Sequence, residues 1–210
     1  PAAAVTGGLI CLLLSDSPTT STSSLLHSGL PPLVLLFIFT FLATRYHRAA
    51  KEAHGLAEAR TGRRASQVIA NLGIAAVAAP LGWHLAAIAA IAEATADTLS
   101  SEIGQAVAGP VFLITTLRRV PPGTDGGLSL VGTLAGLVGA AAVTLAGLPQ
   151  TPHKFLHSAA IFAAATAGLL FDSLLGATLE RRGYLGNDLV NFASTAFAAA
   201  TIILLRPHLI

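Results

Sequence analysis

The chain has 210 residues, of which 53% are hydrophobic and only 10% charged, and its mean hydropathy is +0.72. Soluble domains carry about 25% charged residues, so this composition excludes an ordinary soluble domain and predicts an integral membrane protein. In such a protein the basic residues first report orientation, so the formal net charge of +2 predicts no nucleic-acid partner. The single cysteine, Cys11, excludes an intramolecular disulfide and a cysteine-based metal cluster.

Apolar runs suited to helical spans recur along the whole chain. We expect about seven, the first and third being short: 2–14, 30–44, 67–79, 81–99, 128–148, 155–179 and 189–205. The chain contains no methionine, and we expect the first run to be a truncated span rather than a signal peptide, because no basic residue precedes it. Pro80 and Gly82 predict a tight turn between the third and fourth runs. The sequence thus predicts an all-α, polytopic integral membrane bundle of about six to seven transmembrane helices, with residues 1–210 forming one domain.

The basic residues are unevenly distributed over the predicted loops. Ten of the twelve Lys and Arg residues fall in three loops on the same side, and only Lys154 and Arg206 fall on the other. By the positive-inside rule the first side is cytoplasmic. It includes a basic loop at 45–66 and an Arg- and Gly-rich loop at 104–127. Most of the acids gather toward the same face, where soluble nucleotide and metal are available.

The first candidate site lies in residues 93–104. On a helix Glu93, Asp97 and Ser101 share one face because they are spaced by four, and Ser100 is adjacent. An ionised carboxylate at the bilayer centre costs about 2.5–3.5 kcal/mol, so such acids indicate a function. Carboxylates and hydroxyls together suit a hard divalent cation such as Mg²⁺. The alternative is a solvated helix end.

The second candidate site lies in residues 113–127. Two prolines end any helix there, and the glycines that follow permit backbone conformations in which successive N–H groups cradle an anion. Two arginines supply bidentate donors for phosphate. The predicted phosphate-binding set is Arg118, Arg119, Gly123, Thr124, Gly126 and Gly127. A positive-inside loop with a turn is the alternative.

The third candidate site lies around residues 171–192. Asp172 and Glu180 share one helix face, and Asp188 and Asn191 lie at the start of the last helix. We expect a buried polar cluster shared by several helices, the alternative being a hydrogen-bond network that only joins the helices. In the run 132–147, by contrast, the spacing of the glycines predicts close helix packing.

The basic segment 44–73 permits two interpretations. It is either a surface helix attracted by anionic lipid, or a cover over the site from which Lys51 or Arg63 reaches a phosphate.

Four blocks of sequence resemble the DUF92 / transmembrane protein 19 family, whose plant members include phytyl-phosphate kinase. They are ADTLSSEIG (96–104), LITTLRRVPPGTDGGLSLVGTLAG (113–136), DSLLGATLERRG (172–183) and NDLVNF (187–192). The resemblance implies a polytopic enzyme that phosphorylates an isoprenoid monophosphate to the diphosphate with CTP or ATP. The chain departs from the family in its shorter N-terminal region and in the loop around Glu58.

The resemblance and the three candidate sites together predict residue roles for such a kinase. The expected catalytic residues are Asp97, Asp172 and Arg118. The expected Mg²⁺ ligands are Asp97, Glu102, Asp125, Asp172, Asp188 and Asn191. Lys51, Ser100 and Ser101 join the phosphate-binding set. The alternatives are a lipid-phosphate cytidylyltransferase, a cation- or proton-coupled transporter, and a non-catalytic scaffold.

Overall fold

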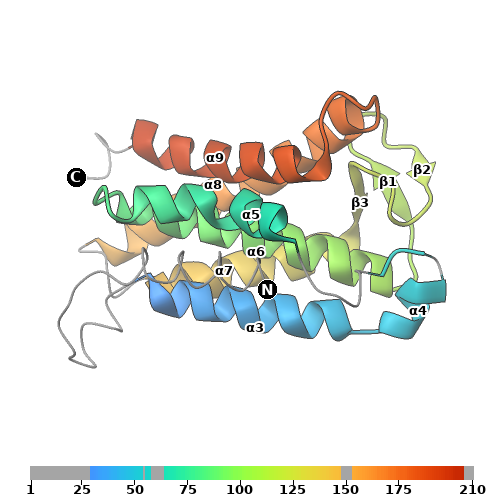
Figure 1. The fold of residues 1–210 in the computed structure, drawn as a ribbon, viewed down its shortest axis with the longest axis horizontal. Helices are drawn as coiled ribbons and strands as arrows, with labels where there is room; N and C mark the ends of the chain where they lie inside the picture. Colours follow the sequence, from blue (N-terminus) through green and yellow to red (C-terminus); the bar gives the residue numbers. More distant parts are fainter. Residues whose placement is uncertain (1–28, 54, 58–63, 148–152, 206–210) are drawn as a thin grey trace.

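The computed structural model describes residues 29–53, 55–57, 64–147 and 153–205 as an antiparallel helical bundle with a small sheet at one end (Figure 1). The predicted span 2–14 lies outside the described residues. The helices are α3 (Leu30–Arg45), α4 (Arg48–Ala53), α5 (Ala65–Ala78), α6 (His84–Ala106), α7 (Leu130–Gly147), α8 (Lys154–Leu175), the π-helical segment η2 (Gly176–Glu180) and α9 (Asn187–Leu205). This architecture confirms the predicted helical membrane bundle.

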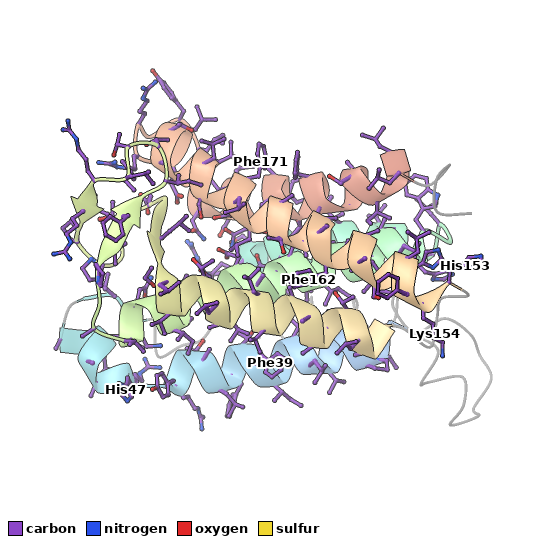
Figure 2. The ribbon with its side chains drawn as sticks, turned by 180° about the vertical axis from the view of Figure 1, so that it is seen from behind. Phe39, His47, His153, Lys154, Phe162 and Phe171 are labelled. Atoms are coloured by element: carbon purple, nitrogen blue, oxygen red, sulfur yellow. The ribbon has the colours of Figure 1, made fainter. Side chains whose placement is uncertain are left out.

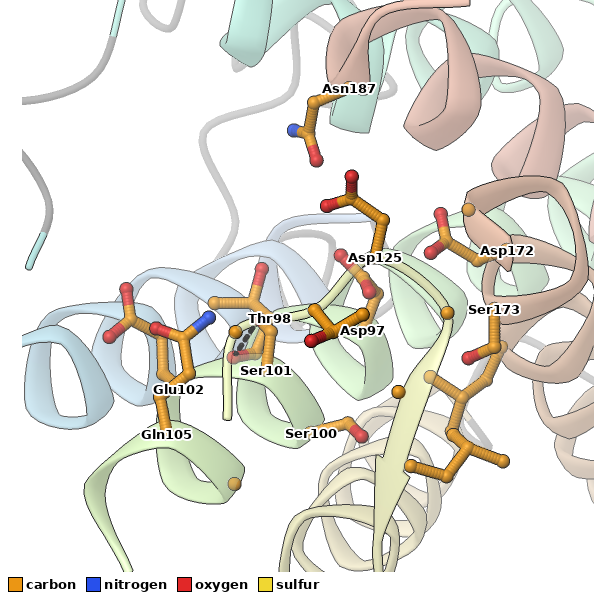
Figure 3. A pocket seen from close by; sticks show the side chains of 18 of the residues that line it. Asp97, Thr98, Ser100, Ser101, Glu102, Gln105, Asp125, Asp172, Ser173 and Asn187 are labelled. Atoms are coloured by element: carbon orange, nitrogen blue, oxygen red, sulfur yellow. Dashed lines mark hydrogen bonds between the residues drawn. The ribbon is translucent and has the colours of Figure 1, made fainter. Parts of the chain in front are cut away.

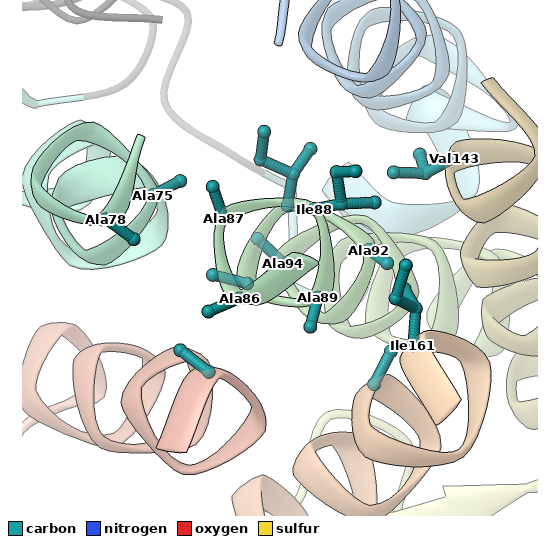
Figure 4. Packing of buried hydrophobic residues seen from close by; sticks show 14 of the residues in the cluster. Ala75, Ala78, Ala86, Ala87, Ile88, Ala89, Ala92, Ala94, Val143 and Ile161 are labelled. Carbon is teal, nitrogen blue, oxygen red and sulfur yellow. The ribbon is translucent and has the colours of Figure 1, made fainter. Parts of the chain in front are cut away.

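Helix α6 lies at the centre of the bundle and packs against α3, α5, α7, α8 and α9. Its first half is rich in alanine, whose small side chain allows several helices to approach closely. Figure 4 shows Ala86, Ala89 and Ala92 among the neighbouring helices, with Ile88 toward Val143 of α7. The three acids of α6 therefore lie inside the protein.

The outer helices present apolar side chains to the surroundings. Within the described residues, α7, α8 continued by η2, and α9 are each long and apolar enough to cross a membrane, whereas α3 and α5 are shorter apolar helices. At about 1.5 Å per residue, these 18 to 27 residues extend about 27–40 Å, against roughly 30 Å of hydrocarbon. Large exposed side chains cover the outside: Phe37, Phe41 and Leu42 on α3, Leu134 and Val138 on α7, and Leu204 on α9.

The segment predicted as the loop 104–127 is more ordered than expected. Helix α6 continues to Ala106, and a three-stranded antiparallel sheet follows, with β1 (Val111–Leu113) between β2 (Arg119–Val120) and β3 (Gly127–Ser129). Phe112 pairs with Arg119 on one side and with Leu128 on the other. The sequence did not predict these strands within the Arg- and Gly-rich loop, because strands of two or three residues have too few positions to show an alternating pattern.

Close backbone contacts join α6 to α7. A Cβ atom on Gly132 would lie 2.4 Å from the carbonyl oxygen of Ser100, and one on Gly136 would lie 2.6 Å from that of Ala96. The predicted packing role of these two glycines is confirmed. The turn expected at Pro80 and Gly82 is also present between α5 and α6, and Gly82 has φ +73°.

Candidate functional site

A polar cavity of about 240 Å³ lies at the end of the bundle that carries the sheet. Its walls come from α5, α6, the loop before β3, the α8–η2 junction and the start of α9. Five lining residues carry carboxyl groups: Asp97, Glu102, Asp125, Asp172 and Glu180. Most of the others are hydroxyl, amide or glycine residues, and none of the lining residues, all in the described part of the chain, is Lys or Arg. Such a lining is chemically suited to cations, or to anions bridged by cations.

Asp97 and Asp172 approach the cavity from two different helices. Asp97 lies on the central helix α6, and Asp172 lies near the end of α8, where its Oδ2 accepts a hydrogen bond of 3.2 Å from the Ser194 hydroxyl of α9. Figure 3 shows both carboxylates at the same hollow. The structure thus brings together the two acids that the sequence predicts to be catalytic.

Asp125 reaches the same hollow on a tight turn. The next residue, Gly126, has φ +73°, and a Cβ there would lie 2.4 Å from the backbone nitrogen of Ala177 and 2.5 Å from the carbonyl oxygen of Ser173. Only glycine allows the turn to press this closely on the α8–η2 junction. Figure 3 shows the Asp125 carboxylate between Asn187 and Asp97.

Glu102 lines the cavity, but its carboxylate is already bound. Lys51 of α4 donates to Glu102 Oε2, and the Thr44 hydroxyl donates to Oε1 at 3.2 Å. Lys51 is fully buried and also donates to the carbonyl oxygens of Ala43 (3.0 Å) and Thr44 (3.1 Å). Lys51 therefore lies behind the cavity wall and holds no phosphate in this arrangement, and Glu102 is the least available of the five acids for a metal ion.

Glu93 lies one helical turn deeper than Asp97 and does not line the cavity. It is 1% exposed, so its carboxyl group is enclosed among the helices. Gly168 of α8 makes room for it, since a Cβ there would lie 2.5 Å from Glu93 Cγ. The sequence places Glu93 on the site face of α6, whereas the structure encloses it in the core beneath the cavity.

Three further predicted residues lie outside the cavity. Arg118 and Arg119 are exposed on the sheet, where the Arg119 guanidinium lies 5.9 Å from the centre of the Phe112 ring. Asp188 is in the first turn of α9 but is not a lining residue. The structure does not bring these side chains together with Asp97 and Asp172. Strand pairing holds the two arginines at the sheet, and Asp188 lies in the first turn of α9 outside the cavity lining.

Two of the backbone N–H groups in the predicted anion cradle already donate hydrogen bonds within the loop. Gly123 and Gly126 have positive φ angles, as expected. However, the N–H of Thr124 donates to the carbonyl oxygen of Pro121 (3.3 Å), and that of Gly127 donates to the carbonyl oxygen of Thr124 (2.9 Å). These two groups stabilise the turns of the loop and are not available to an anion.

The oxygen atoms that line the cavity are of the chemical type that Mg²⁺ binds. Within the described ranges no three His, Cys, Asp or Glu side chains are close enough to hold a metal ion by themselves. Mg²⁺ prefers oxygen ligands and commonly binds one or two carboxylates, with water and substrate phosphates completing its shell. One or two of the three residues Asp97, Asp125 and Asp172 fit this mode. Asn191 also lines the cavity, with its amide nitrogen bonded to Asn71 Oδ1 (3.0 Å).

Sequence reasoning missed several lining residues. Gln67 and Asn71 of α5 line the cavity, as do Gln105 of α6 and Ser129 of β3. Gln67 and Asn71 are spaced by four in an otherwise apolar helix, so they share a face, and this signal was available in the sequence.

The comparisons with known proteins agree with this architecture. The family model described as integral membrane protein DUF92 matches residues 6–199. A membrane protein of Synechocystis is 37% identical over 186 residues, covering 81% of this chain and 71% of that protein, and one of Methanocaldococcus jannaschii is 39% identical over 177 residues, covering 80% and 73%. Both of these relatives are described as uncharacterised.

A third relative is the chloroplastic protein VTE6 of Arabidopsis thaliana, 32% identical over 190 residues. The match covers 83% of this chain but only 57% of VTE6, so the chain spans little more than half of that protein. No solved structure matches significantly. The family match over most of the chain leads to one conclusion: this chain belongs to the integral membrane protein family DUF92.

Proposed function

We propose that the protein is a membrane-embedded kinase that converts an isoprenoid monophosphate, of the phytyl or prenyl type, to the diphosphate with CTP or ATP and Mg²⁺. The observation that supports this most strongly is the cavity, which has five carboxyl-bearing residues and no Lys or Arg among its lining residues in the described chain. Such a lining repels a bare phosphate but accepts a phosphate that arrives with divalent cations. The four sequence blocks that resemble a family whose plant members include phytyl-phosphate kinase, together with the match to the DUF92 family model, support the same class of enzyme.

The proposed reaction requires little covalent chemistry from the protein. An oxygen of the monophosphate forms a bond to the γ-phosphorus of the nucleotide, the bond from that phosphorus to the β-bridging oxygen breaks, and the nucleoside diphosphate leaves. The nucleophile is already an anion, so no general base is needed. Bound Mg²⁺ would neutralise charge on the phosphates. One or two of Asp97, Asp125 and Asp172 would bind the ion directly, and water and the substrate phosphates would complete its shell. Asp172 is oriented for this by the Ser194 hydroxyl.

The hydroxyl and amide side chains of the lining would orient the phosphates, because hydrogen-bond donors placed around a transferring group lower its barrier. Ser100 and Gln105 of α6 and Asn187 of α9 are positioned for this. The apolar residues of the lining are Val111, Leu128 and Leu169. The prenyl chain would extend from the cavity toward the membrane while its phosphate meets the acids.

A turnover assay tests this proposal. Purified protein in lipid, supplied with phytyl or geranylgeranyl monophosphate, Mg²⁺ and CTP or ATP, is expected to form the diphosphate and a nucleoside diphosphate. We expect Asp97→Asn and Asp172→Asn each to lower kcat on the order of 100-fold, because each removes a charge from the cation site. Glu52→Gln is the control, since Glu52 is outside the cavity and pairs with Arg48.

Two outcomes would contradict the proposal. Full activity in both aspartate variants would remove the acids from the mechanism. Release of pyrophosphate in place of a nucleoside diphosphate would identify a cytidylyltransferase.

A further inference from the structure

The cavity is too small for the whole of the proposed phosphate donor. Its volume of about 240 Å³ is below the roughly 300–1,000 Å³ of pockets that enclose drug-sized ligands. It therefore accommodates phosphate groups but not a complete nucleoside triphosphate. If the terminal phosphate of the donor reaches Asp97 and Asp172, the nucleoside must lie over the rim.

One described loop lies in the chain between two residues that line the cavity. Residues 181–186 connect η2 to α9, and the residues on either side, Glu180 and Asn187, both line the cavity. The loop contains two exposed arginines, Arg181 and Arg182, and Tyr184, whose side chain is 73% exposed. Charged donors for phosphate and an aromatic face for a base thus occur together in the short loop that follows the cavity residue Glu180.

Hydrogen bonds fold this loop back onto the end of η2. The N–H of Tyr184 donates to the carbonyl oxygen of Leu179 (3.0 Å), and the N–H of Gly183 donates to that of Glu180 (2.8 Å). Gly183 has φ +74°, a conformation that glycine adopts without strain. The turn keeps the backbone of Tyr184 close to the cavity residue Glu180.

We infer that the loop 181–186 docks the nucleotide donor, with Arg181 and Arg182 contacting the phosphates outside the cavity and the Tyr184 ring stacking on the base. This inference rests on the proposed function and adds the donor subsite to it. Arginine matches phosphate bidentately, and aromatic side chains stack on any base because every base has a π-face. The subsite would therefore accept either CTP or ATP.

Nucleotide binding without any prenyl substrate tests the inference directly. Binding of MgATP and of MgCTP is measured by calorimetry on the full chain in lipid. The variant R181Q/R182Q is expected to raise Kd on the order of tenfold or more, because charge-assisted contacts to phosphate are lost. The variant R118Q/R119Q makes the same change of charge at the same end of the molecule, and we expect it to raise Kd less than about threefold.

Two Tyr184 variants separate stacking from a structural role. Tyr184→Ala is expected to weaken nucleotide binding by about fivefold or more, whereas Tyr184→Phe keeps the ring and is expected to bind as the unchanged protein does. In turnover, Tyr184→Ala is expected to raise KM for the nucleotide and to leave KM for the prenyl monophosphate unchanged. If the ring served only to stabilise the loop, Tyr184→Ala would not raise KM for the nucleotide selectively over KM for the prenyl monophosphate.

The outcomes distinguish this inference from the proposed function. Tight nucleotide binding that depends on Arg181 and Arg182 supports the donor subsite even if no prenyl monophosphate is phosphorylated. Turnover with an unchanged nucleotide Kd in R181Q/R182Q overturns the subsite and leaves the kinase standing. A larger effect from R118Q/R119Q would show that the phosphates of the nucleotide bind at the sheet and not at the loop 181–186. An absence of nucleotide binding would refute both the donor subsite and the proposed kinase.

Discussion

Lys51 shows how much the meaning of a single charge depends on its partner. A lysine in a basic segment beside an acidic site is readily predicted to bind phosphate. In the structure its three N–H donors are used by Glu102 and by the carbonyl oxygens of Ala43 and Thr44. The residue neutralises one of the five cavity acids from behind and connects α4 to α6.

The buried ion pair of Lys51 and Glu102 is expected to stabilise the fold. Lys51→Met leaves the Glu102 charge enclosed without its partner, and breaking a buried pair from one side costs about 3–5 kcal/mol. We therefore expect Lys51→Met to lower the thermal unfolding midpoint strongly, in measurements on the purified protein in detergent.

The double variant K51M/E102Q provides the control. It removes both charges, so most of the lost stability is expected to return, since a neutral replacement of a buried pair is often nearly neutral in free energy. A double variant as unstable as Lys51→Met would show that the lysine acts through its packing and its carbonyl contacts rather than through Glu102.

Among single residues, the sequence predicted which acids line the cavity better than it predicted the positions of the basic residues. Asp97 and Asp172 stand out because hydrocarbon excludes carboxylates, and this argument needs no knowledge of neighbours. The assignments of Lys51, Arg118 and Arg119 required knowing what lies beside them. The partner of Lys51 is 51 positions away in the chain, beyond the reach of any local pattern.

Among the elements, the small sheet and η2 determine the shape of the cavity, and neither was predicted. The sheet depends on pairing between residues such as Val111 and Ser129, which no local propensity reports. The π-helical turn begins at Gly176, where a Cβ would lie 2.8 Å from the nitrogen of Gly126. Wider turns of this kind often occur at functional sites. The sequence predicted polar positions on one face here, but the change of helical pitch follows from tertiary contact.

The contact between α6 and α7 was predicted from its glycines, and it provides the second prediction. Gly136→Ala places a methyl group against the carbonyl oxygen of Ala96 at 2.6 Å, so the helices must separate. Overpacking of this kind costs about 1–3 kcal/mol. We expect a lower unfolding midpoint and reduced turnover, because Ser100 on the same stretch of α6 lines the cavity.

Gly109→Ala is the matched control for this variant. Gly109 lies between α6 and β1, and a Cβ there would have no atom within 4 Å. The same chemical change is expected to leave the midpoint within about a degree, as is usual for a surface substitution. Equal losses in the two variants would mean that glycine flexibility, and not the helix contact, is what the alanine disturbs.

The arrangement of the described helices places most of their charged side chains at the end that carries the sheet. Of the Lys and Arg residues that the structure describes, only Lys154 lies at the end opposite the sheet; Figure 2 shows it there beside His153, far from His47. The alternating directions of α3, α5, α6, α7, α8 and α9 produce this distribution. The distribution agrees with the sequence prediction that the basic loops lie on one side. That prediction needs only the apolar runs and the loop charges, and does not depend on how the helices pack. The central position of α6 was not predicted, since its acids make it the least apolar of the long helices.

The last prediction is that the cavity opens to the cytoplasm, because loops rich in Lys and Arg remain on that side during insertion. In a cysteine-free background (Cys11→Ser), Thr116→Cys marks the exposed β1–β2 loop and His153→Cys marks the opposite end. With the protein in a bacterial inner membrane, an impermeant maleimide is expected to label His153→Cys in intact spheroplasts and Thr116→Cys only after permeabilisation. The reverse pattern would place the acids outside the cell, away from cytosolic nucleotide, and would exclude the kinase. Labelling of both cysteines in intact spheroplasts would show that the chain inserts in two orientations, which the strong asymmetry of its loop charges opposes.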